Sequence, residues 1–105
     1  MSGKVVAVKL ITGEEIIATL KETLDPANYT FERARILNLG RDANGNMGYG
    51  LMPWIHSNMD GSITVSREHV IAMIQPVKQI EDGYMQETSG IQLASSLPPK
   101  GKLNG

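Results

Sequence analysis

Residues 4–21 read KVVAVKLITGEEIIATLK and contain two apolar, β-branched runs on either side of Thr12 and Gly13. Valine and isoleucine favour extended backbone, and a Thr-Gly pair between two such runs is typical of a tight turn. Gly13 is expected to supply the positive φ angle that the turn requires. This stretch therefore predicts an antiparallel hairpin, with strands at residues 4–10 and 15–21.

The segment after the hairpin combines turn chemistry with another apolar run. Asp25 and Pro26 favour a turn. Residues 29–39 (YTFERARILNL) then predict a third, long strand with Phe31 and Ile36 facing the core.

Glycine is frequent in the middle of the chain. Residues 40–50 contain four glycines, and the Asn44-Gly45 pair favours a type I′ turn, so this stretch predicts a long hairpin loop. Shorter apolar segments after the loop complete the predicted sheet, at residues 51–56, 63–65 and 70–75. Pro53 cannot donate to a strand ladder, which places its segment at a sheet edge or a bulge.

The last predicted strand is apolar on both faces. Residues 70–74 read VIAMI, whereas a strand with one wet face alternates apolar and polar residues. A second surface must therefore cover this strand. Barrel closure and contact with another subunit both satisfy that requirement.

The C-terminal part combines a helical pattern with a polar end. Val77, Ile80 and Tyr84 lie near helical spacing, which predicts a short amphipathic helix at 77–85, although Gly83 opposes it. Residues 95–105 are poor in apolar side chains and predict a disordered tail. We therefore expect one domain over residues 1–94.

Composition excludes several classes of protein. The 105 residues carry a net charge of −1 and no cysteine, which rules out disulfides, cysteine-ligated zinc and any overall basic field for nucleic acid. No apolar run approaches the roughly 18 residues of a membrane span, so we expect a cytoplasmic protein without a membrane partner.

Enzyme signatures are weak in this chain. Asp60, Ser66 and His69 are residue types of a hydrolase triad, but no nucleophile elbow accompanies them. His56 and His69 have neither the helical spacing nor the carboxylate neighbours of a metal site. We expect no catalytic residues, no metal and no cofactor.

The hairpin and the turn after it share a spacing with a known family. Six positions resemble the first conserved motif of the Sm, LSm and Hfq family, in the pattern Leu10-x-x-Gly13-x(4)-Ala18-x-Leu20-x(4)-Asp25-x-x-Asn28. Residues 66–76 also resemble the last-strand segment of Hfq, with His69 and Pro76 at matching places. The whole sequence is similar to Sm-like proteins of tailed phages of marine bacteria, which would place it in the host cytoplasm.

The resemblance implies a fold, an assembly and a ligand. The fold is all-β: an Sm-like (SH3-like), strongly bent five-stranded antiparallel barrel. The assembly is a closed ring of five to seven identical subunits, and the ligand is single-stranded, U-rich RNA. Carried over by position, the implied RNA-binding residues are Asn28, Asp25, Arg67 and His69.

The side-chain chemistry of these residues suits an unstacked base. The Asn28 carboxamide complements the donor and acceptor edge of uracil, and the Arg67 guanidinium can stack on a base face. Asp25 is expected either to orient Asn28 or simply to cap the proline turn.

Two departures from the family pattern favour an alternative function. Ala27 stands where uridine-binding members carry a stacking side chain, and Glu68 places a negative charge beside Arg67. Together with the net charge of −1, they favour a structural or assembly ring of phage type with no RNA site.

Overall fold

The computed structural model describes residues 3–89, so the predicted tail at 95–105 lies outside the described residues. Six strands form one antiparallel sheet and a single α-helix follows them: β1 (Lys4–Leu10), β2 (Glu15–Lys21), β3 (Asn28–Arg41), β4 (Met47–Pro53), β5 (Ser62–Ser66), β6 (Val70–Ile74) and α1 (Lys78–Ser89). Two 3-10 turns, η1 (His56–Asn58) and η2 (Arg67–His69), precede β5 and β6.

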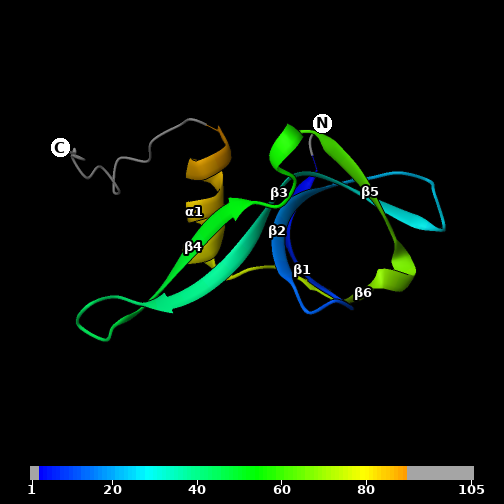
Figure 1. Cartoon of the computed structure of the whole chain (residues 1–105). Helices are drawn as coiled ribbons and strands as arrows, with labels where there is room; N and C mark the ends of the chain where they lie inside the picture. Colours follow the sequence, from blue (N-terminus) through cyan, green and yellow to red (C-terminus); the bar gives the residue numbers. More distant parts are fainter. Residues whose placement is uncertain (1–2, 90–105) are drawn as a thin grey trace.

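The strands curl into a small barrel with one extended arm (Figure 1). The sheet order is β4-β3-β2-β1-β6, and β5 pairs with the first part of β3. The predicted all-β, strongly bent antiparallel fold with a short C-terminal helix is confirmed. The five-stranded barrel that the resemblance implies is a six-stranded sheet here, because β4 and β5 pair with successive parts of β3 and an excursion at 54–61 separates them.

A bulge in β3 produces the bend. Thr19 pairs with Glu32 and Ile17 pairs with Arg35, so Arg33 and Ala34 both stand opposite Ala18. Arg33 has a φ angle of 53°, in the left-handed region that side chains other than glycine rarely adopt. The extra residue turns the second half of β3 away from the barrel, where it pairs with β4 as the arm.

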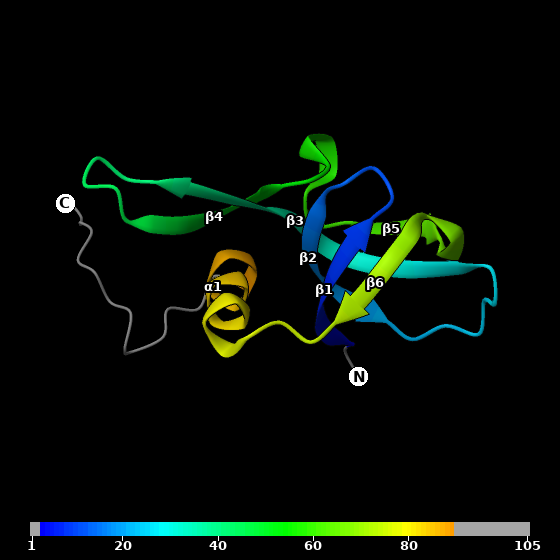
Figure 2. The same cartoon turned by 90° about the horizontal axis from the view of Figure 1, so that it is seen from below.

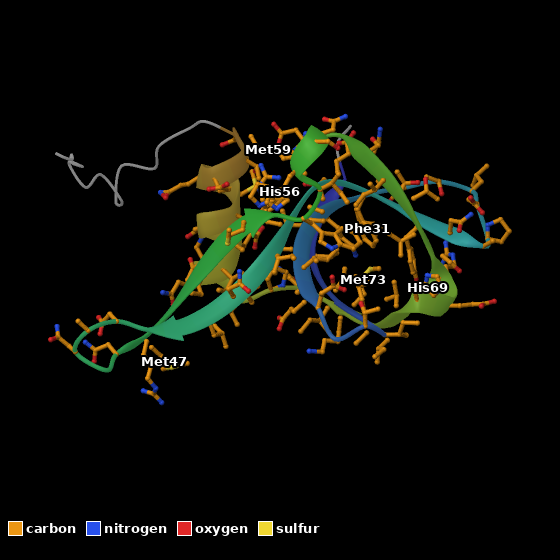
Figure 3. The ribbon with its side chains drawn as sticks, viewed as in Figure 1. Phe31, Met47, His56, Met59, His69 and Met73 are labelled. Atoms are coloured by element: carbon orange, nitrogen blue, oxygen red, sulfur yellow. The ribbon has the colours of Figure 1, made fainter. Side chains whose placement is uncertain are left out.

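The core inside the barrel is apolar. Phe31 and Met73 point into the space that the curled strands enclose (Figure 3). The side chains buried there come from β1, β2 and β3: Val6, Val8, Leu10, Ile16, Ala18, Phe31 and Ala34. The hairpin that the sequence predicts therefore supplies most of this core, and Gly13 has the expected positive φ angle of 101°.

A second core lies outside the barrel, under the helix. Figure 2 shows α1 beside the arm, and the Tyr84 ring on this helix packs with Ala7 and Ile17 on the outer face of the sheet. Gly83 gives the helix room here, because a Cβ atom at this position would lie 2.4 Å from the Tyr49 hydroxyl and would displace that side chain. The residue that opposed the helix prediction is thus what lets the helix approach the sheet.

Buried Arg35 joins three parts of the fold. Its side chain is almost fully buried, and its guanidinium donates to the Met59 carbonyl at 2.7 Å and to Asp60 Oδ1 at 2.8 Å. Its Nε reaches Glu87 Oε2 on α1 at 3.4 Å. This one cation therefore connects the arm, the excursion and the helix.

The prediction of a long loop at residues 40–50 is wrong. Strands β3 and β4 continue through most of this stretch, and only residues 42–46 turn. Gly45 N–H donates to the Asp42 carbonyl and Gly45 alone in the turn has positive φ, which makes a type I turn followed by a left-handed glycine instead of type I′. Pairing with the apolar second half of β3 overrides the turn propensity of glycine.

Strand β6 keeps two large apolar side chains exposed within the described part of the chain. Met73 faces the barrel core, but Ile71 and Ile74 are 64% and 65% exposed. The sequence predicts that both faces of this strand are covered. The barrel of a single chain covers only the face that carries Met73.

We predict that Tyr84→Phe lowers the free energy of unfolding by about 1–2 kcal/mol. The buried Tyr84 hydroxyl donates to the Glu32 carbonyl at 3.2 Å and shares a 2.9 Å hydrogen bond with Thr19, so the substitution leaves both groups without this partner. Chemical denaturation measures the change. Tyr49→Phe is the control, because its exposed hydrogen bond to the Gln79 carbonyl should contribute less than about 0.5 kcal/mol. Equal effects of the two variants would contradict the prediction.

Candidate nucleic-acid interface

Three of the four predicted site residues meet at one end of the barrel. The first residue of β3, Asn28, pairs with Ser66 at the end of β5. The next residue, Arg67, donates its backbone N–H to the Ala27 carbonyl at 2.9 Å. The register of β3 and β5 thus brings Asp25, Asn28 and Arg67 together from distant parts of the chain.

Asp25 holds the turn before β3. Its Oδ1 accepts the Ala27 backbone N–H at 2.9 Å, and its Oδ2 accepts the Asn28 side-chain N–H at 3.0 Å. Both expected roles of this carboxylate, capping the turn and orienting Asn28, are present in one geometry. The hydrogen bond from Asn28, followed by that from the Ala27 N–H, lowers the pKa of Asp25 below its usual value of 3.8.

The Arg67 guanidinium lies over an aromatic ring. Its central carbon is 4.2 Å from the Tyr29 ring centroid, and one of its Nη2 hydrogens is donated to the Asp25 carbonyl at 3.1 Å. The Tyr29 ring in turn lies 5.9 Å from the ring of buried Phe31, centroid to centroid. The guanidinium is therefore fixed on one face by a ring that is itself anchored to the barrel core.

These contacts leave groups on Asn28 and Arg67 available to a ligand. One amide hydrogen of Asn28 is used by Asp25, so its second amide hydrogen and its carbonyl oxygen are free to face a base edge. Arg67 is exposed, and the guanidinium face opposite Tyr29 can stack on a planar base. The arrangement can form hydrogen bonds to the edge of one unstacked base and stack on its face.

His69 has a different setting from the other predicted residues. It lies in η2 with Arg67, but its carbonyl accepts the Ile11 N–H at 2.9 Å and the residue lines a separate cleft with Trp54. Figure 3 shows His69 at the end of the barrel away from the arm. The structure therefore does not place His69 with Asp25 and Asn28.

Sequence reasoning missed Tyr29 as part of this site. It looked for a stacking side chain at position 27, where alanine stands. The available signal was the alternation of Tyr29 and Phe31, which puts both rings on one face of the strand.

Residues 3–89 show neither a metal-binding cluster nor a membrane-spanning helix. No group of three or more histidine, aspartate or glutamate side chains in this part of the chain is arranged to hold a metal ion. No helix in the same residues has the length and apolar character needed to cross a membrane.

Comparisons with known proteins find similarity among solved structures. No family model and no curated protein matches the chain. Among solved structures, the chain is similar to a heptameric archaeal Sm protein, with 24% sequence identity and a TM-score of 0.43. The match covers 70% of this chain and 87% of the archaeal chain.

We predict that the Asp25 carboxyl titrates below 3.8, and that Asn28→Ala returns its pKa toward this value. The variant removes the largest cause of the lowered pKa, the hydrogen bond from the Asn28 side chain. Carboxyl chemical shifts followed by NMR against pH measure the change. Arg67→Ala is the comparison, because the charge of Arg67 is the weakest contributor to the lowered pKa and its loss should matter less. A larger shift with Arg67→Ala would show that charge, and not the side-chain hydrogen bond, holds the carboxylate.

Proposed function

We propose that this chain forms a closed homo-oligomeric ring that binds single-stranded RNA, with one site per subunit at Asp25, Asn28 and Arg67. The observation that carries the proposal is the Asn28 carboxamide, held by Asp25 beside a guanidinium that is stacked on Tyr29. A structural turn needs the Asp25 bonds, but it does not need an exposed arginine positioned over a ring next to a partly unused carboxamide.

Uracil has an edge that these groups can bind. The free Asn28 oxygen can accept the uracil N3–H, and its remaining amide hydrogen can be donated to a uracil carbonyl. Stacking on the outer face of Arg67 would add contact area without selecting the base.

The ring part of the proposal rests on strand edges. Among the described residues, β5 pairs only with β3 and β6 pairs only with β1. These two edge strands have five residues each and are joined by η2, so β5 of one subunit can pair with β6 of the next. Such a head-to-tail contact repeats around a closed ring and covers Ile71 and Ile74.

A ring would also compensate for weak individual sites. Several sites on one particle raise the effective concentration of the next RNA segment, so a modest contact per subunit suffices. We place the ring in the cytoplasm, which for a chain of phage origin is that of the host cell.

The alternative function is a structural or assembly ring without RNA. Exposed Glu68 follows Arg67 directly, and its carboxylate would repel phosphate. Ala27 supplies only backbone groups to the site, so it adds no stacking surface. The experiments below separate this alternative from RNA binding.

We predict that the purified protein is a closed oligomer and that Ile71→Asp weakens subunit association by about a hundredfold or more. An unpaired charge in a buried interface costs about 3 kcal/mol or more, which corresponds to that factor. Light scattering over a range of concentrations measures the assembly. Val77→Asp is the control, because Val77 is 67% exposed before α1 and lies on neither strand edge. A wild type that is monomeric at every concentration would refute the ring.

We predict that Arg67→Ala weakens binding to oligo-U and oligo-A alike, by about tenfold, through lost stacking and charge. Asn28→Ala should instead narrow the preference for oligo-U, because it removes base-edge contacts. Fluorescence anisotropy at low salt measures both effects. Arg41→Ala makes the same charge change at the arm tip, where Arg41 contacts the Gly45 carbonyl, and should leave binding unaltered.

Ala27→Tyr offers a gain-of-function test of the same site. Its backbone bonds to Asp25 and Arg67 do not involve the side chain, so a tyrosine can add a stacking face without breaking them. Absence of binding by the wild type at low salt, with no gain from Ala27→Tyr, would favour the structural ring.

A further inference from the structure

A second cleft opens at the barrel end near the β1–β2 turn, away from Asp25 and Asn28. It has a volume of about 360 Å³, which is in the size range of small-molecule sites. Its lining residues include Trp54, His69 and Ile11, which is 55% exposed. Such a cleft suits a flat ring between an aromatic wall and an aliphatic wall.

The aromatic wall is held in place by a carboxylate. Trp54 donates its indole N–H to Glu14 Oε2 at 3.3 Å, and the Thr12 hydroxyl donates to Glu14 Oε1. The Trp54 backbone N–H also donates to the Ala34 carbonyl at 3.1 Å, which ties the residue to the β3 bulge. The indole is thus oriented before any ligand arrives, so little order is lost on binding.

The same carboxylate sets the polar requirement of the cleft. A carboxylate has about four acceptor positions, two on each oxygen. Thr12 occupies one position on Oε1 and Trp54 occupies one on Oε2, which leaves one acceptor on each oxygen. The cleft is therefore complementary to a flat ring that carries two neighbouring N–H donors on one edge.

Among the nucleobases, guanine has this edge. Its N1–H and its 2-amino group are parallel neighbouring donors, whereas adenine and cytosine offer a single amino group and uracil a single imide N–H. Paired hydrogen bonds to a carboxylate are among the stronger contacts in proteins.

We propose that the cleft formed by Glu14, Trp54 and His69 binds a guanine base. Glu14 accepts the two N–H donors, and the indole provides the stacking face. The base can belong to a free nucleotide or to an RNA strand, and the chemistry of recognition is the same for both. The site does not include Asn28 or Arg67, so this proposal can be tested independently of the proposed function.

The single tryptophan of the chain makes the test direct. Trp54 fluorescence is followed while the full-length protein is titrated with the monophosphates of guanosine, inosine, adenosine and uridine, with free N-acetyltryptophanamide as the optical control. Guanosine monophosphate should give a saturable change. Inosine monophosphate lacks the 2-amino donor and should bind about tenfold more weakly, with adenosine and uridine monophosphates weaker still.

The variants test the carboxylate. Glu14→Gln replaces one acceptor by a donor and should weaken guanosine monophosphate about tenfold. Glu15→Gln makes the same charge change at an exposed neighbouring position and should have no effect. The inosine comparison needs no substitution, so it decides the question even where Glu14→Gln perturbs folding.

A titration with RNA distinguishes a free nucleotide from an RNA strand as the source of the base. Oligo-U with one guanosine is compared with oligo-U alone and with guanosine monophosphate. A change with the free nucleotide assigns the cleft to nucleotides, and a change only with the guanosine-containing RNA assigns it to a strand. Equal responses to all four nucleotides without any difference between the two RNAs, or no response to any ligand, would overturn the proposal. Oligo-U anisotropy measured in parallel reports separately on the Asn28 site.

Discussion

The left-handed backbone of Arg33 is the constraint on which the rest of the structure depends. A residue in this region stores roughly 1–3 kcal/mol of strain, which the surrounding strand pairs must offset. The bulge divides β3 into a first part that pairs with β5 around the barrel and a second part that pairs with β4 as the arm. Without the bend, one long strand could not take part in both.

The arm needs its own support because it leaves the barrel core. The helix supplies that support through Tyr84, whose hydroxyl satisfies a β3 carbonyl and a β2 hydroxyl beside the bulge. Burial raises the pKa of this hydroxyl, which keeps it a neutral donor. Arg35, the second residue after the strained position, adds charged contacts to the excursion and to the helix. The outer face of the sheet thus forms a second core, in which the Tyr84 hydroxyl and the Arg35 guanidinium are hydrogen-bonded.

The two candidate sites share a physical design. In each, a carboxylate near a turn orients a neighbouring side chain, Asp25 for Asn28 and Glu14 for Trp54. Asp25 acts within its own turn, whereas Glu14 contacts a residue 40 positions away that the strand pairing brings to the β1–β2 turn. The turn η2 connects the two sites, since Arg67 belongs to one and His69 to the other.

The sequence by itself determined the features that depend on near neighbours. The β-branched runs predict β1 and β2, Gly13 predicts its turn, and Asp25 with Asn28 predicts a capped loop, because these interactions span a few residues. Only the tertiary structure decided that the glycines at 40–50 lie largely in strands, that Tyr29 supports Arg67, and that His69 lines a cleft with Trp54. Those outcomes depend on which strands pair and in what register, and such long-range pairing overrides local propensity where side chains are small or exposed.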